Sequence, residues 1–357
     1  NQPVDWSSAA NFSLRAATSR PRLIQGDVTT SYLKIKRDFA TRVPLSLEVG
    51  VNYKNEKRDR KRMDLDTWTF LGRDGVADSA DDRAGVIAAD HYAKAPDAQF
   101  GYPAVEHLSM AKYYELFKAH PEYFRYEEAI SYRRSAETVN KLTESVKALY
   151  LQGDTRLFSN RVNLLGGVRF ERTEDEGAGV LNDIRLTYQQ DASGRLIVDA
   201  AGRPIKVTTN ALENAKLQYT LKGSRGENAY HGFYPSLNAS FNLTPRLVAR
   251  AAYARTIGRP NFPEIIPGLT ITDPGAVSGN RTITAINGTL QPWTADNYDL
   301  TLELYEARGA TASVSLFQKQ ITGFFITTRT PATLEGLGAF GLGDDYLDYD
   351  IITKRNG

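Results

Sequence analysis

The chain contains short segments in which apolar and polar residues alternate strictly. Between Leu45 and Lys54 the odd positions are apolar or aromatic, and the even positions are polar, charged or glycine. Successive side chains of a strand point to opposite faces, so this pattern predicts a strand with one apolar face and one polar face. The pattern returns at 164–171, 237–243 and 299–304. Such strands, about ten residues long, are typical of a membrane β-barrel with a wet lumen.

The same reasoning, applied along the chain, predicts an all-β antiparallel transmembrane barrel wall of about ten strands. The predicted strands are 9–19, 24–39, 43–57, 143–156, 161–174, 184–189, 230–242, 246–256, 297–306 and 310–326. Short joins lie at 38–44, 155–161, 243–246 and 307–309, and long joins at 58–142, 173–229 and 257–296. Bacterial barrels have short periplasmic turns and long extracellular loops, so we expect the long joins to be extracellular.

The alternation also predicts which side chains face lipid. We expect these apolar side chains to point outward: Leu47, Val49, Val51, Val168, Phe170, Ala239 and Leu302. We expect these polar side chains to point inward: Glu48, Asn52, Arg169, Glu171 and Glu303. A slip of one residue in register would reverse every assignment.

The long joins contain local structure of their own. The insertion 58–142 is too long to be unstructured in a compact domain, and apolar residues at helical spacing predict a helix over 105–118, with Pro121 soon after it. Residues 194–207 predict a small hairpin about the turn at 201–203. We expect no tandem repeat of fixed period.

Composition fits this picture. Hydrophobic content is 41% and mean hydropathy is −0.42, which a barrel tolerates because only alternate strand residues face lipid. No apolar run is long enough for a transmembrane helix. The 44 basic and 42 acidic residues nearly balance, which gives no reason to expect nucleic acid as a partner. Cysteine is absent, which excludes disulfides and thiol catalysis.

Catalytic and metal-binding motifs are missing from the sequence. The histidines have no metal-ligand spacing, and neither a G-x-S-x-G motif nor a P-loop occurs. We therefore predict no enzyme activity, no catalytic residue, no cofactor and no metal. Glu171 and Glu174 could form a glycosidase pair, but lumen-facing charge is the simpler interpretation. Calcium stays open because aspartates cluster without the spacing of a calcium loop: Asp74, Asp78, Asp81, Asp82, Asp344, Asp345, Asp348 and Asp350.

Aromatic residues in the long joins are candidate ligand contacts, because rings with a polar edge suit sugars. They could equally pack the loops against themselves. The set is Trp68, Phe70, Tyr92, Phe100, Tyr102, Tyr113, Tyr114, Tyr123 and Trp293. Arg255 and Arg259 could contact ligand or could satisfy loop carbonyls at a strand end. The basic run 56–62 could bind a polyanion, or could be a solvated strand extension near lipopolysaccharide phosphates. Our candidate ligand-binding residues are Trp68, Tyr113, Tyr114, Arg259 and Trp293.

An ordered set of motifs carries a family resemblance. Residues 233–238 read Phe-Tyr-Pro-Ser-Leu-Asn, 252–260 end in Arg-Pro, and 288–300 contain Leu-Gln-Pro-Trp-Thr-Ala-Asp-Asn-Tyr-Asp-Leu. Upstream, 146–152 and 166–173 look like paired mid-barrel strands. In this order the motifs resemble the barrel of TonB-dependent outer-membrane receptors, especially the subgroup linked to carbohydrate uptake in Gram-negative bacteria.

The resemblance implies a receptor that captures a scarce solute, such as an oligosaccharide, and imports it by TonB-coupled active transport. It implies a barrel of about 22 strands in the outer membrane, with lipid, lipopolysaccharide and the TonB complex as partners. The family's plug domain, TonB box and C-terminal aromatic have no counterpart in residues 1–357. We therefore expect an interior piece of the barrel, with 58–142 as an extracellular insertion and TonB contact through a missing N-terminal plug. The alternatives are a passive porin and a secreted β-rich protein that binds or cleaves glycans.

Overall fold

A computed structural model describes residues 4–63, 66–89, 105–275, 281–306 and 309–357. Side chains 61–63 and 222 also lie outside the description. The chain divides into two compact units. The loop unit comprises Asn1–Arg22, Arg62–Thr138 and Asn210–Lys216, and the wall unit comprises Leu23–Lys61, Val139–Thr209 and Leu217–Gly357.

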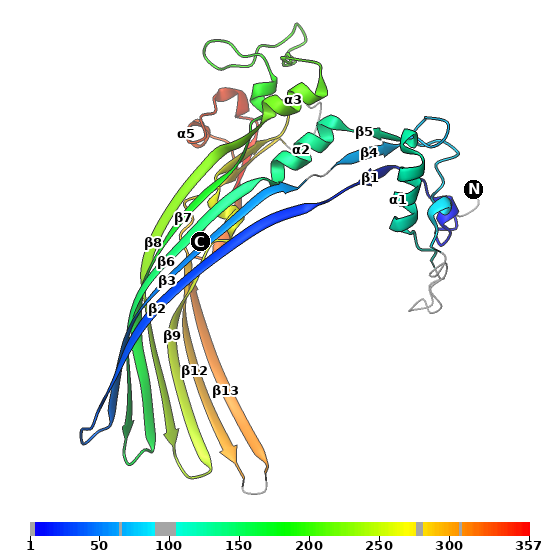
Figure 1. The fold of residues 1–357 in the computed structure, drawn as a ribbon. Helices are drawn as coiled ribbons and strands as arrows, with labels where there is room; N and C mark the ends of the chain where they lie inside the picture. Colours follow the sequence, from blue (N-terminus) through cyan, green and yellow to red (C-terminus); the bar gives the residue numbers. More distant parts are fainter. Residues whose placement is uncertain (1–3, 64–65, 90–104, 276–280, 307–308) are drawn as a thin grey trace. The chain divides into compact units, whose positions relative to one another are not determined.

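The wall unit is built on one curved eight-stranded sheet, here called the wall (Figure 1). Its order is β13-β12-β9-β8-β7-β6-β3-β2, and every pairing with a known register is antiparallel between strands adjacent in the wall. The sheet is open, with β2 and β13 at its edges. The bounds are β2 Arg22–Phe39, β3 Leu45–Met63, β6 Asn140–Leu157, β7 Val162–Asn182, β8 Tyr219–Asn242, β9 Leu247–Gly258, β12 Trp293–Tyr305 and β13 Thr311–Thr322. The prediction of an antiparallel all-β wall is confirmed.

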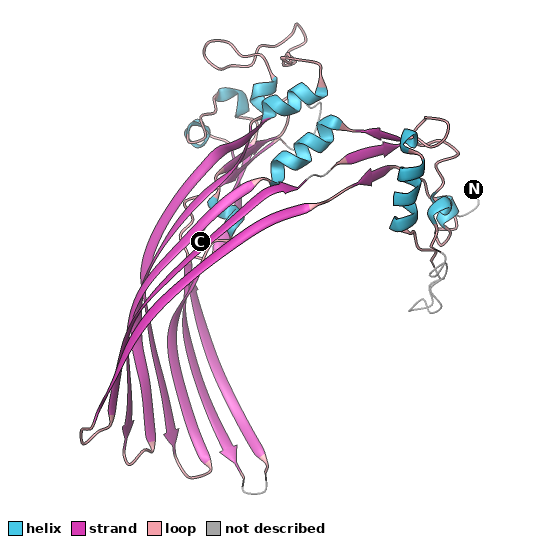
Figure 2. Cartoon of the chain, in the orientation of Figure 1, coloured by secondary structure: helices cyan, strands magenta, loops and turns pink. Residues whose placement is uncertain are grey.

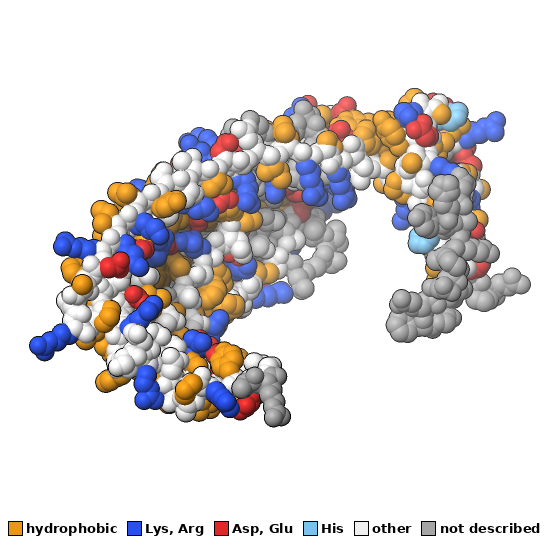
Figure 3. All heavy atoms as spheres, turned by 60° about the horizontal axis from the view of Figure 1, so that its bottom comes forward, with side chains coloured by type: hydrophobic (Ala, Val, Ile, Leu, Met, Phe, Trp, Pro, Cys, Tyr) orange, Lys and Arg blue, Asp and Glu red, His pale blue; other side chains and the backbone are white. Residues whose placement is uncertain are grey.

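The register gives the wall two faces. Val49 lies opposite Leu151, and Leu151 lies opposite Val168, so these residues share one face. Asn52 lies opposite Ala148, and Ala148 opposite Glu171, on the other face. All residues predicted to point outward fall on the first face, here the apolar face, and all predicted to point inward fall on the second, the polar face. Figure 3 shows hydrophobic side chains along the convex side of the wall.

A second, four-stranded sheet, here the loop sheet, lies in the wall unit, with the order β10-β11-β15-β14. Its strands are β10 Gly268–Ile271, β11 Thr282–Ile286, β14 Phe325–Pro331 and β15 Asp350–Asn356, with β11 parallel to β15. The turns α4 Phe262–Ile265, α5 Leu334–Gly338 and η6 Asp344–Tyr346 flank it. Ile283 and Leu337 are fully buried at the centre of its core.

The loop unit is a small three-stranded sheet covered by helices (Figure 2). Its elements are η1 Ala9–Asn11, β1 Ala16–Thr18, β4 Thr67–Phe70, η2 Ala84–Ile87, α1 Met110–Ala119, η4 Pro121–Tyr123, β5 Phe124–Tyr126, α2 Glu128–Thr138 and most of α3 Ala211–Gln218. The helix predicted over 105–118 is present as α1, which begins at Met110 because the Ser109 side chain accepts the Lys112 amide at 3.2 Å. None of the described helices is long and apolar enough to span a membrane.

Three predicted strands need correction. Residues 9–19 form η1 and the short β1, which pairs with β4 outside the wall, because Leu14 and Ala17 pack in the core of the loop unit. Residues 184–189 are not a wall strand: η5 Ile184–Thr187 forms there, and the Asp183 side chain caps it by accepting the Arg185 amide. Residues 310–326 form two strands, because Gly323 has a φ of +72° between β13 and β14.

The expectation of no tandem repeat is wrong for the segment after η5, which contains two copies of an octapeptide. Residues 191–198 read Asp-Ala-Ser-Gly-Arg-Leu-Ile-Val, and 199–206 read Asp-Ala-Ala-Gly-Arg-Pro-Ile-Lys. Ile197 donates its amide to the Gln189 carbonyl, Ile205 to Ile197, and Gln189 to Ile205, each at 2.9 Å. These bonds form a closed backbone ring with a period of eight residues. The predicted hairpin about 201–203 is confirmed as one side of this ring by the bridge from Val198 to Pro204.

Candidate functional site

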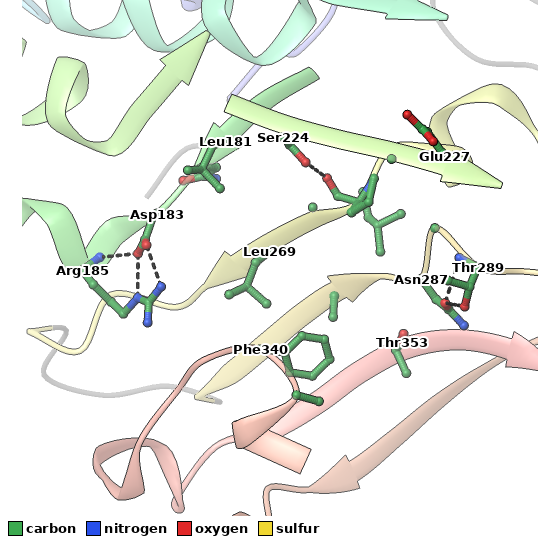
Figure 4. Close-up of a pocket in the computed structure, with 18 residues that line it drawn as sticks. Leu181, Asp183, Arg185, Ser224, Glu227, Leu269, Asn287, Thr289, Phe340 and Thr353 are labelled. Carbon is green, nitrogen blue, oxygen red and sulfur yellow. Dashed lines mark hydrogen bonds and ion pairs between the residues drawn. The ribbon is translucent and has the colours of Figure 1, made fainter. Parts of the chain in front are cut away.

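A cavity of about 580 Å³ lies in the wall unit, between the loop-side ends of β7 and β8 and the loop sheet (Figure 4). Strands β10, β11 and β15 and the turn after α5 supply the facing side of this cavity, here called the rim cavity. The residues that line it are Leu181, Asn182, Asp183, Arg185, Ser224, Gly226, Glu227, Pro267, Gly268, Leu269, Ala285, Ile286, Asn287, Gly288, Thr289, Ala339, Phe340 and Thr353.

Glycines of the wall allow the loop sheet to approach this closely. A Cβ at Gly177 would lie 2.7 Å from Cγ1 of Ile266, and one at Gly226 would lie 2.3 Å from Cδ of Pro267. Both glycines sit at polar-face positions of their strands. The Ser224 hydroxyl donates to the Pro267 carbonyl and fixes the segment that leads into β10. The chain after β9 therefore folds back onto the polar face of β7 and β8.

The main charged pair of the rim cavity is internally neutralised. Arg185 donates to the two carboxylate oxygens of Asp183 at 2.9 and 2.7 Å, and to the Gly341 carbonyl at 3.0 Å. The hydrogen bond to Asp183 raises the pKa of Arg185 above its usual value, so the pair stays ionised. Glu227 belongs to the other face of β8, since it shares the face of Phe233. The cavity therefore carries little net charge.

The remaining lining combines apolar surface with neutral polar groups. Leu269 and Phe340 lie close together in Figure 4, on the side of the loop sheet. Asn287 accepts hydrogen bonds from the Thr289 amide at 3.1 Å and hydroxyl at 2.7 Å, which orients both side chains. One apolar wall with a few fixed amide and hydroxyl groups is the usual arrangement of a small-molecule site. The geometry suits an uncharged solute with an apolar face and several hydroxyl groups.

The candidate residues Trp68, Tyr113 and Tyr114 belong to the loop unit. The ring of Trp68 lies 5.3 Å from that of Phe117, and the ring of Tyr113 lies 5.6 Å from that of Phe124. Burial raises the pKa of Tyr113 to about 12. Tyr114 is 60% exposed, and Lys118 lies 4.9 Å from the centre of its ring. Of these rings, Tyr114 is the most accessible to a ligand.

The candidate residues Arg259 and Trp293 lie in the wall unit but do not line the rim cavity. Arg259 donates to the Glu171 carboxylate and, at 3.4 Å, to the Thr173 hydroxyl. It thus pairs with side chains of β7, not with loop carbonyls as the structural alternative supposed. Trp293 pairs with Gly258 across β12 and β9, where its ring covers the glycine.

The sequence did not reveal a buried polar cluster on the polar face of β6, β7 and β8, beside Arg259. Asp175 is only 3% exposed, lies opposite Glu144, and interacts with the Tyr230 hydroxyl of β8. Glu171, Thr173 and Asp175 occupy alternate positions along β7, which places all three on one face. This spacing was the feature of the sequence that could have revealed the cluster. Glu174 has the opposite parity and pairs with Lys147 at 2.8 Å. The expectation that Glu171 and Glu174 both face the lumen is therefore wrong, and they cannot act as a facing glycosidase pair.

The acidic loops use their carboxylates internally. Asp81 accepts the amides of Arg73 at 2.7 Å and Asp74 at 3.2 Å, and Asp78 pairs with Arg15 at 2.8 Å. Asp344 pairs with Arg195. Among the described residues, no group of three or more acidic or histidine side chains could hold a metal ion. The candidate residues Tyr92, Phe100 and Tyr102 lie outside the described residues.

The family follows from comparison of the whole sequence with family models. The model "TonB dependent receptor-like, beta-barrel" matches residues 2–353. The chain belongs to the TonB-dependent receptor β-barrel family. Comparison with curated proteins finds no match.

Several solved structures are similar to this chain over part of their length. A mutant ferric enterobactin receptor PfeA from Pseudomonas aeruginosa, in complex with enterobactin, is 13% identical with a TM-score of 0.45; the alignment covers 93% of this chain and 32% of that one. The closed form of the ferric-catecholate import receptor Fiu from Escherichia coli K12 is 12% identical with a TM-score of 0.44; the alignment covers 85% of this chain and 32% of that one. The unliganded ferric citrate transporter FecA is 13% identical with a TM-score of 0.41; the alignment covers 87% of this chain and 29% of that one. This TonB-dependent receptor chain thus spans about a third of the length of these structures.

Proposed function

We propose that the chain is part of an outer-membrane receptor that binds a scarce solute and imports it by TonB-coupled active transport. The family match over residues 2–353 supports this proposal. Barrels of the family are outer-membrane proteins of Gram-negative bacteria. The receptor contacts the TonB complex through an N-terminal plug, and its reaction is binding and translocation, in which no bond of the solute is broken.

The ligand is an uncharged solute, and an oligosaccharide is our first choice. The observation that carries this choice is the rim cavity, where Asp183 neutralises Arg185 and the other inward groups are apolar, amide or hydroxyl. An anionic ferric chelate needs unpaired positive charge, which this cavity does not offer. A sugar ring can stack on Phe340 while its hydroxyl groups pair with Asn287 and Thr289.

Binding to the full-length receptor, measured by isothermal titration calorimetry, tests this proposal. The probes are neutral hexasaccharides of glucose and of xylose, with ferric enterobactin as the anionic probe. We expect at least one hexasaccharide to bind, and Phe340→Ala to weaken it by about 10-fold, which corresponds to about 1.4 kcal/mol. The matched control is Phe317→Ala, a wall residue that is 82% exposed and lies outside the cavity. Binding of the ferric chelate alone would overturn the choice of ligand.

The insertion 58–142 is proposed to be extracellular and to contribute to ligand recognition, through Tyr114 in particular. Long ordered loops on a rigid scaffold are common recognition elements. Deleting residues 74–123 from the full-length receptor, with surface expression checked, should lower hexasaccharide uptake. Unchanged affinity and uptake would show that this insertion has only a structural role.

A further inference from the structure

Three aromatic side chains on the polar face of the wall each occupy the space beside a glycine. The three pairs are Tyr150 with Gly50, Tyr234 with Gly232, and Trp293 with Gly258. A Cβ at Gly50 would lie 2.6 Å from the Tyr150 hydroxyl, and a Cβ at Gly232 would lie 2.6 Å from the Tyr234 hydroxyl. Glycine is therefore required at these positions because an aromatic ring already fills the place of a side chain.

These aromatic rings lie against the sheet instead of standing out from it. Cβ positions directly opposite each other on neighbouring strands are about 5 Å apart. The side chain of Tyr150 on β6 therefore reaches Gly50 of β3 only by leaning across it. All three aromatic side chains are half-buried. The sheet covers one side of each ring, and the exposed part faces away from the sheet.

The three rings follow one another across the polar face, starting near the rim cavity. Trp293 comes four residues after Thr289 of that cavity, and its ring lies 6.0 Å from that of Phe324. The register places Tyr234 two strands from Trp293 and one level nearer to the short turns. Tyr150 lies two strands further, at the level of Tyr234. Strand spacing and rise make these steps about 12 Å and about 10 Å.

Charged hydrogen-bonding groups lie beside the tyrosines. Glu48 accepts the Tyr150 hydroxyl at 2.7 Å. Arg169 lies between Tyr150 and Tyr234, directly opposite both. It donates to Glu171 at 2.9 Å, and its side chain is 36% exposed. Aromatic surface flanked by donors and acceptors suits a solute with apolar faces and hydroxyl edges, which is the chemistry of a sugar ring.

We propose that Trp293, Tyr234 and Tyr150 form an aromatic track that carries an oligosaccharide from the rim cavity through the lumen. This inference rests on the proposed function, which makes the polar face the lumen and an oligosaccharide the solute. A sugar ring stacks on each aromatic ring in turn, while its hydroxyl groups pair with Arg169 and Glu48. Because the contacts are similar and weak, the solute advances without a deep trap. The rim cavity then sets the affinity, and the track sets the rate of passage.

Uptake of the glucose and xylose hexasaccharides by cells that express the full-length receptor tests the track. The double variant Tyr150→Leu, Tyr234→Leu keeps apolar side chains beside both glycines but removes the aromatic rings. It should lower the maximal uptake rate per receptor about 10-fold, from the usual strength of two aromatic contacts, and leave the calorimetric affinity unchanged. The double variant Tyr150→Phe, Tyr234→Phe keeps the rings and should keep the wild-type rate.

The matched control is Tyr53→Leu, Tyr298→Leu, which removes two tyrosines from the apolar face, where they are 39% and 44% exposed. It should keep the wild-type rate per receptor, with surface receptor measured by flow cytometry. If the lumen rings only cover glycine backbone, their removal lowers the amount of receptor but not the rate per receptor, and that result would overturn the track. Equal rate losses in the control, or a loss of affinity equal to the loss of rate, would also overturn it.

The wild-type receptor gives a second readout, which does not depend on folding of the variants. A hexasaccharide with a photoreactive diazirine, irradiated during uptake, should label peptides that contain Tyr150 and Tyr234. Label confined to the rim cavity would overturn the track while leaving the transport proposal intact. Absence of any hexasaccharide binding in calorimetry would instead refute the choice of ligand, and the track with it.

Discussion

An arginine placed on the apolar face should destabilise the wall far more than one placed on the polar face. Val49 is 42% exposed on the apolar face of β3, between Leu47 and Val51, and lies opposite Leu151 of β6. Asn52 is three residues further along the same strand, but it lies on the polar face. The pair Val49→Arg and Asn52→Arg therefore compares the two faces within one strand.

The magnitude follows from the position of Val49 within the apolar band. From Leu45 to Tyr53 the strand rises about 26 Å at about 3.3 Å per residue. A tilt of about 45° reduces this to about 19 Å of membrane depth, and Val49 lies midway. An arginine near the bilayer midplane costs about 2–4 kcal/mol of folding free energy. At Asn52 the side chain stays in a wet lumen, so we expect a change below about 1 kcal/mol.

The assay is a urea titration of the full-length receptor folded into lipid vesicles, followed by tryptophan fluorescence. The conservative change Val49→Leu serves as a control for repacking. Val49→Arg should lower the free energy of unfolding by about 2–4 kcal/mol, whereas Asn52→Arg and Val49→Leu should stay close to the wild type. Equal losses at Val49 and Asn52, or a larger loss at Asn52, would refute the assignment of the faces.

Further predictions concern the core, the polar cluster and the acidic turn. Leu337→Ala removes a fully buried side chain and should cost about 2–5 kcal/mol of local stability, seen as faster amide exchange in the loop sheet. Glu171 pairs with two cations, Arg259 and, at 2.8 Å, Arg169. Arg259→Met removes one of them and should destabilise the wall by about 1–3 kcal/mol; adding Glu171→Gln should restore most of this in urea titrations, and an unchanged loss would refute the pairing. Hydrogen bonding, mainly from the Ser79 hydroxyl, lowers the pKa of Asp81 to about 2. The ionised Asp81 carboxylate therefore stabilises the turn fully above its unfolded pKa of about 4, and this stabilisation is lost as the pH falls through 2. Pepsin should therefore cut the wild-type turn only near pH 2 but cut Asp81→Asn already at pH 4, and identical profiles would contradict this.

Residue alternation predicted the wall well because lipid and water impose a period of two on every strand that separates them. Strands β3, β6, β8, β9 and β12 all overlap their predicted ranges, and the two-faced register is confirmed. Alternation failed where the apolar side chains pack into a local core instead. Leu14, for example, packs in the core of the loop unit. The spacing of apolar residues alone does not distinguish such a core residue from a lipid-facing one.

The rim cavity could not be predicted, because its residues come from segments far apart in the sequence. Leu181 of β7, Leu269 of β10 and Phe340 after α5 meet only when the loop sheet folds back onto the wall. The glycines at 177 and 226, which allow this contact, look like ordinary breaks in a strand pattern. The aromatic residues did stand out in the sequence, but a ring that packs in a core, such as Trp68, has the same composition signal as one that binds sugar.

The octapeptide ring constrains how this surface loop can change during evolution. Gln189, Ile197 and Ile205 each donate one backbone amide and accept another within the ring, so its bonding capacity is complete. A third copy of the octapeptide would find no free partner there, and loss of one copy would leave a donor and an acceptor unpaired. Point substitutions at the exposed turns leave the ring intact. We therefore expect related receptors to vary this loop in sequence but to conserve the number of copies.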